Sequence, residues 1–316
     1  MHRPWFHCRI IFQITRTNPD VDSLTHAFVV SLSLPASIPS LYLFAMVLGA
    51  IIPDIDILFK PLSDNYPSLF ILTHGGFTHS FAGAAVVAGL AWLGIILGVT
   101  AGACPSCSGV PPILFLIIFA GTCTHLVLDS LAFPGIPLLY PLSPKKFTIG
   151  IFPGPSIVLF AASIIFAVIL VGGAGSGSVA LGYSAFFVTF ILLSAGIRSF
   201  VRIRTKGIII PTFHPFRWLV IRNENASYIL EGYDLVRGTT FKGMYVKFTG
   251  LDPRDLLCIE GRPEVRRHRF YSYIVTAERT NEGILLSDPL RKEKILFYPP
   301  FYIEVTVPDK VHEKTG

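Results

Sequence analysis

The sequence predicts a polytopic α-helical membrane protein with about five spanning helices, an N-terminal half-helix and a C-terminal cytoplasmic β-rich domain. The first observation is composition: 52% of the 316 residues are hydrophobic and only 15% are charged, whereas soluble domains carry about 25% charged residues. The second is distribution, because charges are sparse between Leu24 and Phe200 and frequent from Arg202 onward. A membrane region is therefore followed by a polar region that is long enough to fold on its own.

The chain divides into three predicted parts. Residues 1–21 form an N-terminal extension, residues 22–206 a helical membrane domain with a metal site, and residues 207–316 a soluble β-rich domain. The apolar run Cys8–Ile14 in the extension is too short for the core of a signal peptide. Our hypothesis is that translation begins at Val21, read from a GTG codon, so that the residues before it are not translated. Mass spectrometry of the N-terminus tests this hypothesis, and a peptide containing Trp5 would contradict it.

Five apolar stretches approach the ~20 residues with which a helix crosses the hydrocarbon core. They are Leu41–Phe59, Phe81–Val99, Ile113–Phe133, Ile157–Val171 and Val179–Phe200. The shorter stretch Leu24–Leu34 precedes them and Pro35 follows it, so we expect a half-helix or one arm of a hairpin. Within the second stretch, Gly83, Gly89 and Gly94 predict close packing against other helices.

Lysine and arginine set the predicted orientation, because cytoplasmic loops of membrane proteins are enriched in them. Basic residues follow the last apolar stretch and also lie in two loops that counting places on the same side: Arg198, Arg202, Arg204 and Lys206, then Lys145 and Lys146, and Lys60. The loops on the other side, Thr100–Pro112 and Gly172–Ser178, contain neither residue type. We therefore predict a multi-pass protein of the inner (cytoplasmic) membrane with its C-terminal domain in the cytoplasm.

The region after residue 206 has the composition of β structure and no sustained helical period. Four of its segments are rich in β-branched and aromatic residues: Tyr228–Val236, Met244–Phe248, Tyr271–Ala277 and Ile295–Val307. The net charge of +6 suits anionic headgroups in a membrane protein, so membrane lipids are the expected partners and nucleic acid is not expected. An odd number of cysteines excludes a disulfide framework. For Cys104 and Cys107, which form a C-x-x-C motif, we favour two small loop residues over a disulfide or a metal clip.

Ionisable residues also lie within or beside the apolar stretches, where such residues are costly and usually functional. They are His26, Asp54, Asp56, His74, His79, His125 and Asp129. The predicted orientation places all of them at the cytoplasmic ends of the stretches. We therefore expect them to gather at one membrane face.

The spacing of these residues suits metal binding. His125 and Asp129 are four residues apart, so both project from one face of a helix, and Asp54 and Asp56 would share a face in extended backbone. Imidazole and carboxylate ligands favour Zn, Mn or Fe, and several carboxylates would permit one divalent ion or two. We expect the seven residues, or a subset, to be the metal ligands, with Asp54, Asp56 and His79 carrying the catalysis.

Each residue also has a structural alternative. The alternatives are a helix cap at Asp54, a loop histidine at His74, a buried hydrogen-bonded histidine at His26, and an intrahelical hydrogen bond between His125 and Asp129. Four further residues are expected to support the ligands without binding the metal. They are Asp22, Asp64, Thr78 and Ser80.

A set of motifs occurs in one order along the chain: Ser23–His26, Gly49–Asp56, His74–Ser80, His125–Asp129, Pro137–Ser143 and Pro211–Trp218. This order resembles the YdjM-like family of LexA-binding, inner-membrane-associated hydrolases, and the resemblance covers the chain from about Asp22 to Trp218. It implies a membrane-bound, metal-dependent hydrolase. Relatives often carry His-Arg-Gly where this chain has His74-Gly75-Gly76, so a cation that would hold an anionic substrate or a carboxylate is missing here. Lys145 and Lys146 are the candidate substitutes.

Residue chemistry and resemblance together predict hydrolysis of an ester, or a phosphoester, of a lipid-like substrate at the cytoplasmic face. One alternative is a transporter of metal ions or protons that uses the same residues as a pathway. The position of these residues at one end of the spans, away from the midplane, argues against it. The other alternative is a membrane-anchored interaction protein without catalysis, but the tail contains no motif that identifies a protein partner.

Overall fold

The computed structural model describes residues 20–35, 37–103, 109–154 and 156–308. The extension up to residue 19 and the pair Cys104 and Cys107 lie outside these residues. The chain forms two compact units. The helical unit takes its residues from Met1–Asp54, Ala84–Leu128 and Pro155–Phe190, and the mixed unit comprises Ile55–Gly83, Asp129–Gly154 and Ile191–Gly316. The domain boundary at residue 206 stays a prediction.

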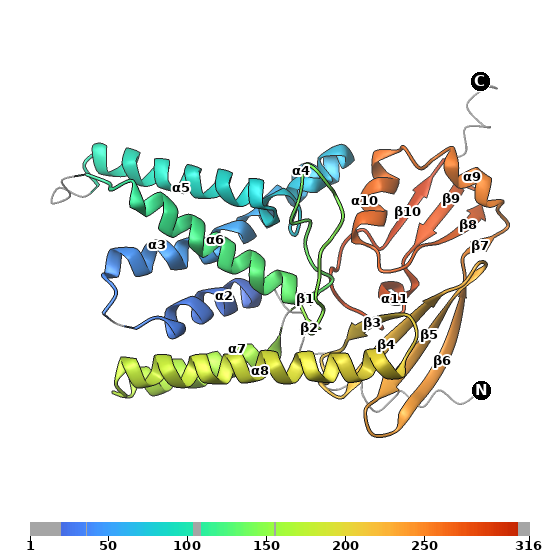
Figure 1. Ribbon diagram of the computed structural model, residues 1–316. Coiled ribbons are helices and arrows are strands. Elements are labelled where there is room, and N and C mark those ends of the chain that lie inside the picture. The colour runs from blue at the N-terminus through green and yellow to red at the C-terminus, as the bar shows by residue number, and fades with distance from the viewer. Residues whose placement is uncertain (1–19, 36, 104–108, 155, 309–316) are drawn as a thin grey trace. The chain divides into compact units, whose positions relative to one another are not determined.

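Long apolar helices build the helical unit (Figure 1). They are α2 (Asp20–Ser33), α3 (Ser40–Ile51), α5 (Phe81–Thr100), α6 (Ile113–Leu131), α7 (Ile157–Val171) and α8 (Ser176–Arg204), of which α5, α6 and α8 extend into the mixed unit at one end. Helix α2 packs against α3 and against α7. Apolar sequence folds as helix here because a helix bonds its own backbone groups, for which lipid offers no partners.

Four helical segments in the described chain are long and apolar enough to cross a membrane: Ser40–Asn65, Phe81–Thr100, Ile113–Leu131 and Ser176–Arg204. The remaining predicted span, Ile157–Val171, is α7. This apolar helix has 15 residues and measures about 22 Å at ~1.5 Å per residue. A crossing by α7 stays a prediction. The predicted half-helix is α2, which ends at Ser33, before Pro35.

The backbones of α3 and α6 touch at two glycines. A Cβ atom on Gly49 would collide with the backbone of α6, and one on Gly121 would collide with the backbone of α3. Small residues let membrane helices approach this closely. On α5, a Cβ on Gly83 would collide with the backbone of Phe77 and Thr78, which directly precedes the helix, and not with another membrane helix as predicted. The same prediction is wrong for Gly94, which has open space around it, and Gly89 makes only ordinary contact.

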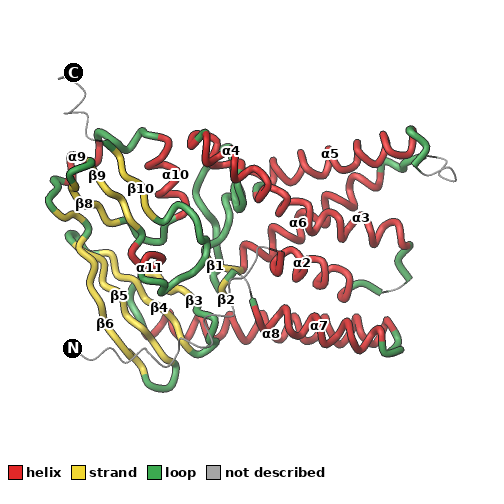
Figure 2. The backbone as a smooth tube through the Cα atoms, turned by 180° about the vertical axis from the view of Figure 1, so that it is seen from behind, coloured by secondary structure: helices red, strands yellow, loops and turns green. Residues whose placement is uncertain are grey.

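Two four-stranded sheets form most of the mixed unit (Figure 2). The first is an antiparallel meander of β3 (Ile208–Pro211), β4 (Arg217–Asn223), β5 (Ser227–Asp234) and β6 (Gly238–Val246). The second has the order β10-β9-β8-β7, with bounds Glu304–Val307, Gly283–Ser287, Thr276–Thr280 and Phe248–Thr249. Its pairs are antiparallel except β7 with β8. The short strands β1 (Ala132–Phe133) and β2 (Phe152–Pro153) form a separate parallel pair.

Short helices connect α3 to α5, where they carry polar motifs, and other short helices connect strands of the second sheet. They are η2 (Ile52–Phe59), α4 (Lys60–Asn65), η3 (Pro67–Leu72), η4 (Phe77–His79), α9 (Pro253–Leu257), α10 (Pro263–Tyr271) and α11 (Pro289–Lys292). The segment η2 begins in the helical unit and ends in the mixed unit. Helix α10 packs against η3. Proline stands at the first turn of α9, α10 and α11, where its missing N–H costs nothing.

Each sheet of the mixed unit buries an apolar face. One core contains Ile210, Leu219, Ile221, Leu230, Ile274 and Leu290, and the other contains Leu256, Ile259, Val265, Ala277, Ile284, Leu286 and Val307. Buried and half-buried positions alternate along β5 from Leu230 to its end, as the two faces of a strand require. The β-rich character predicted for the tail is therefore confirmed.

The limits of several predicted strands differ from the structure, and Met244–Phe248 covers only the end of β6 and the start of β7. The prediction for Tyr271–Ala277 is wrong at its start, because Tyr271 ends α10 and the strand begins only at Thr276. Within the predicted strand Ile295–Val307, only its last four residues form a strand, β10. The guanidinium of buried Arg291 bonds backbone carbonyls between residues 299 and 302, and a strand would need those carbonyls for its ladder.

Candidate metal centre

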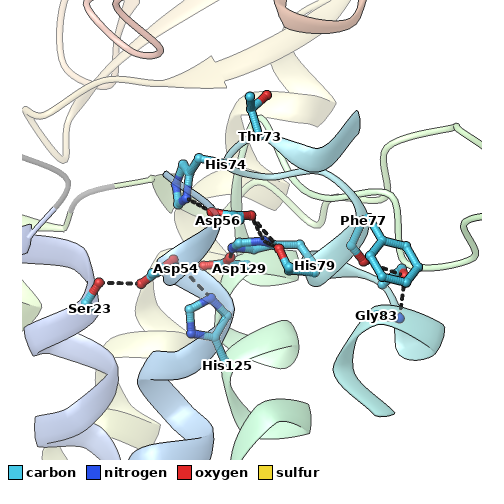
Figure 3. Close-up of polar contacts among 12 residues, drawn as sticks. Ser23, Asp54, Asp56, Thr73, His74, Phe77, His79, Gly83, His125 and Asp129 are labelled. Carbon is cyan, nitrogen blue, oxygen red and sulfur yellow. Dashed lines mark hydrogen bonds and ion pairs between the residues drawn. The ribbon is translucent and has the colours of Figure 1, made fainter. Parts of the chain in front are cut away.

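The seven predicted ligands form two clusters, one in each unit, and Figure 3 labels all of them except His26. The helical-unit cluster consists of His26 on α2, Asp54 on η2 and His125 on α6, together with Ser23 on α2. The mixed-unit cluster consists of Asp56 on η2, His74, His79 on η4 and Asp129 on α6, together with Thr78 on η4. The residues that the sequence singled out therefore do come together, in two groups.

Asp56 is the centre of the mixed-unit cluster (Figure 3). Its Oδ1 lies 3.1 Å from Nδ1 of His74, and its Oδ2 lies 3.1 Å from Nδ1 of His79. The same Oδ2 accepts a hydrogen bond from the Thr78 hydroxyl. His79 Nε2 lies 3.3 Å from Oδ2 of Asp129. Asp56 and His79 are almost fully buried, at 1% and 0% exposed, so water does not screen these charges.

His79 faces a carboxylate oxygen at both ring nitrogens. A neutral imidazole carries one proton, so it can donate to only one of these carboxylates. At the other nitrogen a lone pair faces a carboxylate, and this contact needs either a second proton or a cation. Asp56, His74 and His79 each offer a ligand atom within 4.8 Å of the others. Ligand atoms of a tetrahedral site with bonds of ~2.0–2.1 Å lie about 3.3 Å apart, so the donor set fits a divalent transition metal.

His125 in the helical-unit cluster has a distinct role for each ring nitrogen. Nδ1 lies 2.7 Å from the carbonyl oxygen of Ala50, which can only accept, so Nδ1 carries the proton. Nε2 lies 3.4 Å from Oδ1 of Asp54. In the neutral ring Nε2 is a lone pair, so two acceptors face each other unless a proton or a cation lies between them. Metal-binding histidines commonly donate their other N–H to a backbone carbonyl in this way.

His26 and Ser23 complete the helical-unit cluster. The rings of His26 and His125 stack with centroids 3.9 Å apart and 23° between their planes. Both rings are buried, at 3% and 0% exposed, and two stacked imidazolium ions would repel each other strongly there. Ser23 Oγ donates to Oδ2 of Asp54 at 2.5 Å and so orients that carboxylate. The stack favours a neutral ring, which is the form that binds metal.

Glycine and serine shape the segment that carries His74 and His79. Gly75 has a φ of 75°, a left-handed conformation that glycine adopts without strain. A Cβ atom on Gly76 would collide with the backbone of η3. Ser80 Oγ accepts from the backbone N–H of residue 83 at 3.0 Å and so caps the first turn of α5. Gly76 therefore permits a tight path that a residue with a side chain would block.

Asp54 and Asp56 do not share a face, and that prediction is wrong. They lie in η2, a 3₁₀ helix with ~3 residues per turn, so residues two apart point in different directions. Asp54 contacts the helical-unit cluster and Asp56 contacts the mixed-unit cluster. The prediction assumed extended backbone after Pro53.

The supporting residues divide in a similar way. Thr78 bonds Asp56, as expected for a residue that orients a ligand. Asp64 instead pairs with Lys60 at 2.6 Å and accepts from the Tyr302 hydroxyl at 2.8 Å. Ser80 caps α5, and the side chain of Asp22 lies outside the described residues. Ser23 was missed as a supporting residue, although its place three residues before His26 on one helical face was a usable signal.

The tail also reaches the mixed-unit cluster. The ring of Tyr298 meets the ring of His74 edge to face, with centroids 6.2 Å apart and 83° between their planes. No motif in the sequence marks this residue, because its partner lies more than 200 positions away. Only the tertiary structure could reveal it.

The model of the YdjM inner membrane protein family matches residues 21–200. Comparisons with curated proteins and with solved structures found no match.

Proposed function

The chain belongs to the YdjM inner membrane protein family, and from this premise we propose that it is a membrane-bound, metal-dependent hydrolase. Its substrate is an ester, or a phosphoester, of a lipid-like molecule. The apolar helices support a membrane location, and imidazole and carboxylate groups that lie close together, such as those of Asp56, His74 and His79, support a divalent ion such as Zn, Mn or Fe. The sequence resemblance to hydrolases supports the reaction class.

One observation carries the metal part of the proposal. His125 has its Nδ1 proton bound to the Ala50 carbonyl, so Nε2 presents a lone pair to Asp54 at 3.4 Å. A divalent cation bound by both groups would stabilise this pairing. The rival is an imidazolium–carboxylate ion pair, which the stacked ring of His26 disfavours because it brings a second imidazole against the charge. A metal ion therefore fits the cluster better than a proton does.

The protein's residues would divide the work as follows. The candidate ligands are His26, Asp54 and His125 in the helical unit and Asp56, His74, His79 and Asp129 in the mixed unit, and a subset of them would hold one ion or two. A divalent cation supplies Lewis acidity, since it polarises an ester or phosphoryl oxygen and acidifies water.

Proton transfer falls to a carboxylate that is left free of the metal. Asp54 and Asp56 are the candidate bases, and Asp129, whose side chain is 16% exposed, is the carboxylate of the mixed-unit cluster through which a proton can leave to water. The two ring nitrogens of His79 face Asp56 and Asp129, so in a site where His79 does not bind the metal this ring would pass the proton between the two carboxylates.

A lipid-like substrate follows from where the ligands stand in the sequence of spans. Asp54 comes directly after the apolar helix α3, and His125 and Asp129 occupy the last turns of α6. Ends of spanning helices lie at the level of lipid headgroups, where the scissile ester bonds of lipids are found.

We propose that the C-terminal region faces the cytoplasm, because Arg202 and Arg204 close α8 and Lys206 follows. A C-terminal fusion to green fluorescent protein should fluoresce, whereas a fusion to alkaline phosphatase at the same position should be inactive. Active phosphatase with a dark fluorescent fusion would reverse the orientation and move the proposed site to the other face.

The proposal is tested by metal analysis joined to turnover. The full-length protein in lipid nanodiscs should contain at least one equivalent of a transition metal, and it should release phosphate from phosphatidic acid when Mn or Zn is supplied. A chelator should abolish the release, and added metal should restore it. Protein without bound metal that is inactive on lipid and soluble phosphoesters alike would overturn the proposal. Flux of the metal into liposomes without hydrolysis would assign transport instead.

A further inference from the structure

Tyr271, the last residue of α10, reaches the segment that carries His74. Its hydroxyl contacts Oγ1 of Thr73 and lies 3.2 Å from the Phe70 carbonyl oxygen and 3.4 Å from the His74 carbonyl oxygen. Tyr271 and Thr73 are buried, at 4% and 1% exposed. Burial raises the pKa of Tyr271, so its hydroxyl stays protonated and can donate. One side chain thus bonds the backbone on which His74 stands.

The ring of Tyr298 contacts the imidazole ring of His74. The two rings meet edge to face, a geometry that aromatic pairs prefer and that adds ~0.5–1.5 kcal/mol beyond burial. A Cβ atom on Gly154 would lie within 4.0 Å of the Tyr298 ring, so the chain at Gly154 also packs close to this ring. The orientation of the His74 imidazole therefore depends on where Tyr298 is held.

A buried ion pair holds the loop of Tyr298. Arg291 Nε lies 2.7 Å from Oδ2 of Asp288, with side-chain exposures of 1% and 0%. The same guanidinium donates to carbonyl oxygens of Pro299 at 3.0 Å and Phe301 at 2.8 Å. The Tyr273 hydroxyl donates to the Tyr298 carbonyl at 2.6 Å. The loop is thus fixed by donors that cannot exchange for water.

The segment that follows Asp56 is also fixed from the tail. The Tyr302 hydroxyl lies 3.1 Å from Oγ of Ser63 and 2.8 Å from Oδ1 of Asp64, both on α4, which follows η2 directly. Arg267 on α10 donates to the Ser63 carbonyl. Residues from α10 and from the loop before β10 therefore contact both stretches that carry the central ligands of the mixed-unit cluster.

All seven candidate ligands lie within residues 21–200, the part that matches the family, whereas the residues that hold the mixed-unit segments lie beyond it. We propose that Tyr271 and Tyr298 are positioning residues that set the His74 imidazole against Asp56. The inference rests on the proposed metal centre and extends it: the region after residue 206 completes the geometry of a site whose ligands it does not supply.

The physical reason is the weakness of the local backbone. Gly75 in a left-handed conformation and Gly76 beside it leave His74 with little stiffness of its own. If His74 were not held in place, metal binding would have to order it, and this ordering costs conformational entropy. Removing a residue that contacts a metal ligand without binding the metal typically lowers metal affinity ~10–100-fold. We expect losses of this size here.

The test compares three single variants in the full-length protein. Tyr271→Phe removes only the hydroxyl, and Tyr298→Leu removes the ring edge. Tyr245→Phe is the matched control, because this hydroxyl donates to Glu293 in the same unit at 2.8 Å. Affinity for Zn is measured by titration, geometry by the visible spectrum of the Co-substituted protein, and folding by thermal melting. Tyr271→Phe and Tyr298→Leu should each bind Zn about 10–100-fold more weakly with a shifted Co spectrum. Tyr245→Phe should match the unchanged protein in both.

The outcomes separate this inference from the proposed function. Unchanged affinity and spectrum in Tyr271→Phe and Tyr298→Leu, with metal bound normally by the unchanged protein, would overturn the positioning role and leave the metal centre standing. Equal losses in all three variants would also overturn it, since they would report general destabilisation. Absence of metal from the unchanged protein would instead remove the proposed function. If Tyr271→Phe melts early, the result for Tyr298→Leu decides.

Discussion

His79→Ala and His125→Ala should each lower metal affinity about 10²–10³-fold. The binding free energy of a structural zinc site is ~10–16 kcal/mol, so one of four ligands accounts for about 2.5–4 kcal/mol. Each histidine is fully buried and has a nitrogen directed at a carboxylate, Asp56 and Asp129 for His79 and Asp54 for His125. Truncation to alanine removes the neutral imidazole nitrogen and leaves the metal with the carboxylates alone at that position.

The measurement is bound metal per protein by mass spectrometry, followed by titration of the stripped protein with Zn. His214→Ala is the matched control, because His214 is an exposed histidine in the tail and lies in neither cluster. The stoichiometry also counts the ions. If each cluster binds its own ion, each variant keeps one equivalent; if a single ion is bound, both variants lose it. Full occupancy in both variants with wild-type affinity would show that neither histidine is a ligand.

Replacing Arg291 by methionine should destabilise the protein by about 3–5 kcal/mol, the range for a buried ion pair that loses one partner. Asp288 is 0% exposed and would keep its charge without a counter-ion. Backbone carbonyls of Pro299 and Phe301 would also lose their donor. The pair is expensive to break because both groups are already removed from water, so nothing replaces the lost contacts.

Arg279→Met is the matched control for this prediction. Arg279 Nη2 lies 2.8 Å from Oδ2 of Asp255, close to the 2.7 Å of the buried pair, but both side chains are 40% exposed. Exposed pairs contribute only about 0–1 kcal/mol. Thermal melting should therefore show a drop of at least about 6 °C for Arg291→Met and little change for Arg279→Met. Equal effects of the two variants would mean that burial does not decide the strength of the pair.

Local physics made the membrane helices predictable. A run such as Phe81–Thr100 has no charged residue, and a helix is the form in which such a run satisfies its backbone in lipid. The helical limits predicted for α5 and α7 agree with the structure within a residue. The strands of the tail were harder, because β-branched residues also occur in loops. The stretch before β10 has strand composition and yet curves around Arg291.

The ligand types were also predictable, since a histidine or aspartate within an apolar stretch is costly unless it has a function. Their grouping was not. Asp54 and Asp56 are two positions apart and contact different clusters, because η2 is a 3₁₀ helix and not extended chain. Gly94 looked like a packing position and has open space around it, whereas Gly49 and Gly121 bring two backbones into contact.

The sequence alone determined that this chain has long apolar helices, a polar β-rich tail, and imidazole and carboxylate groups at the ends of the apolar stretches. These properties are local: they depend on the residue types within one segment and on the free energy of moving that segment out of water. Only the tertiary structure decided which carboxylate each histidine faces, that His125 presents Nε2 and not Nδ1 to Asp54, and that Tyr271 bonds the backbone at His74. These are contacts between residues far apart in the chain, and composition and spacing carry no record of them.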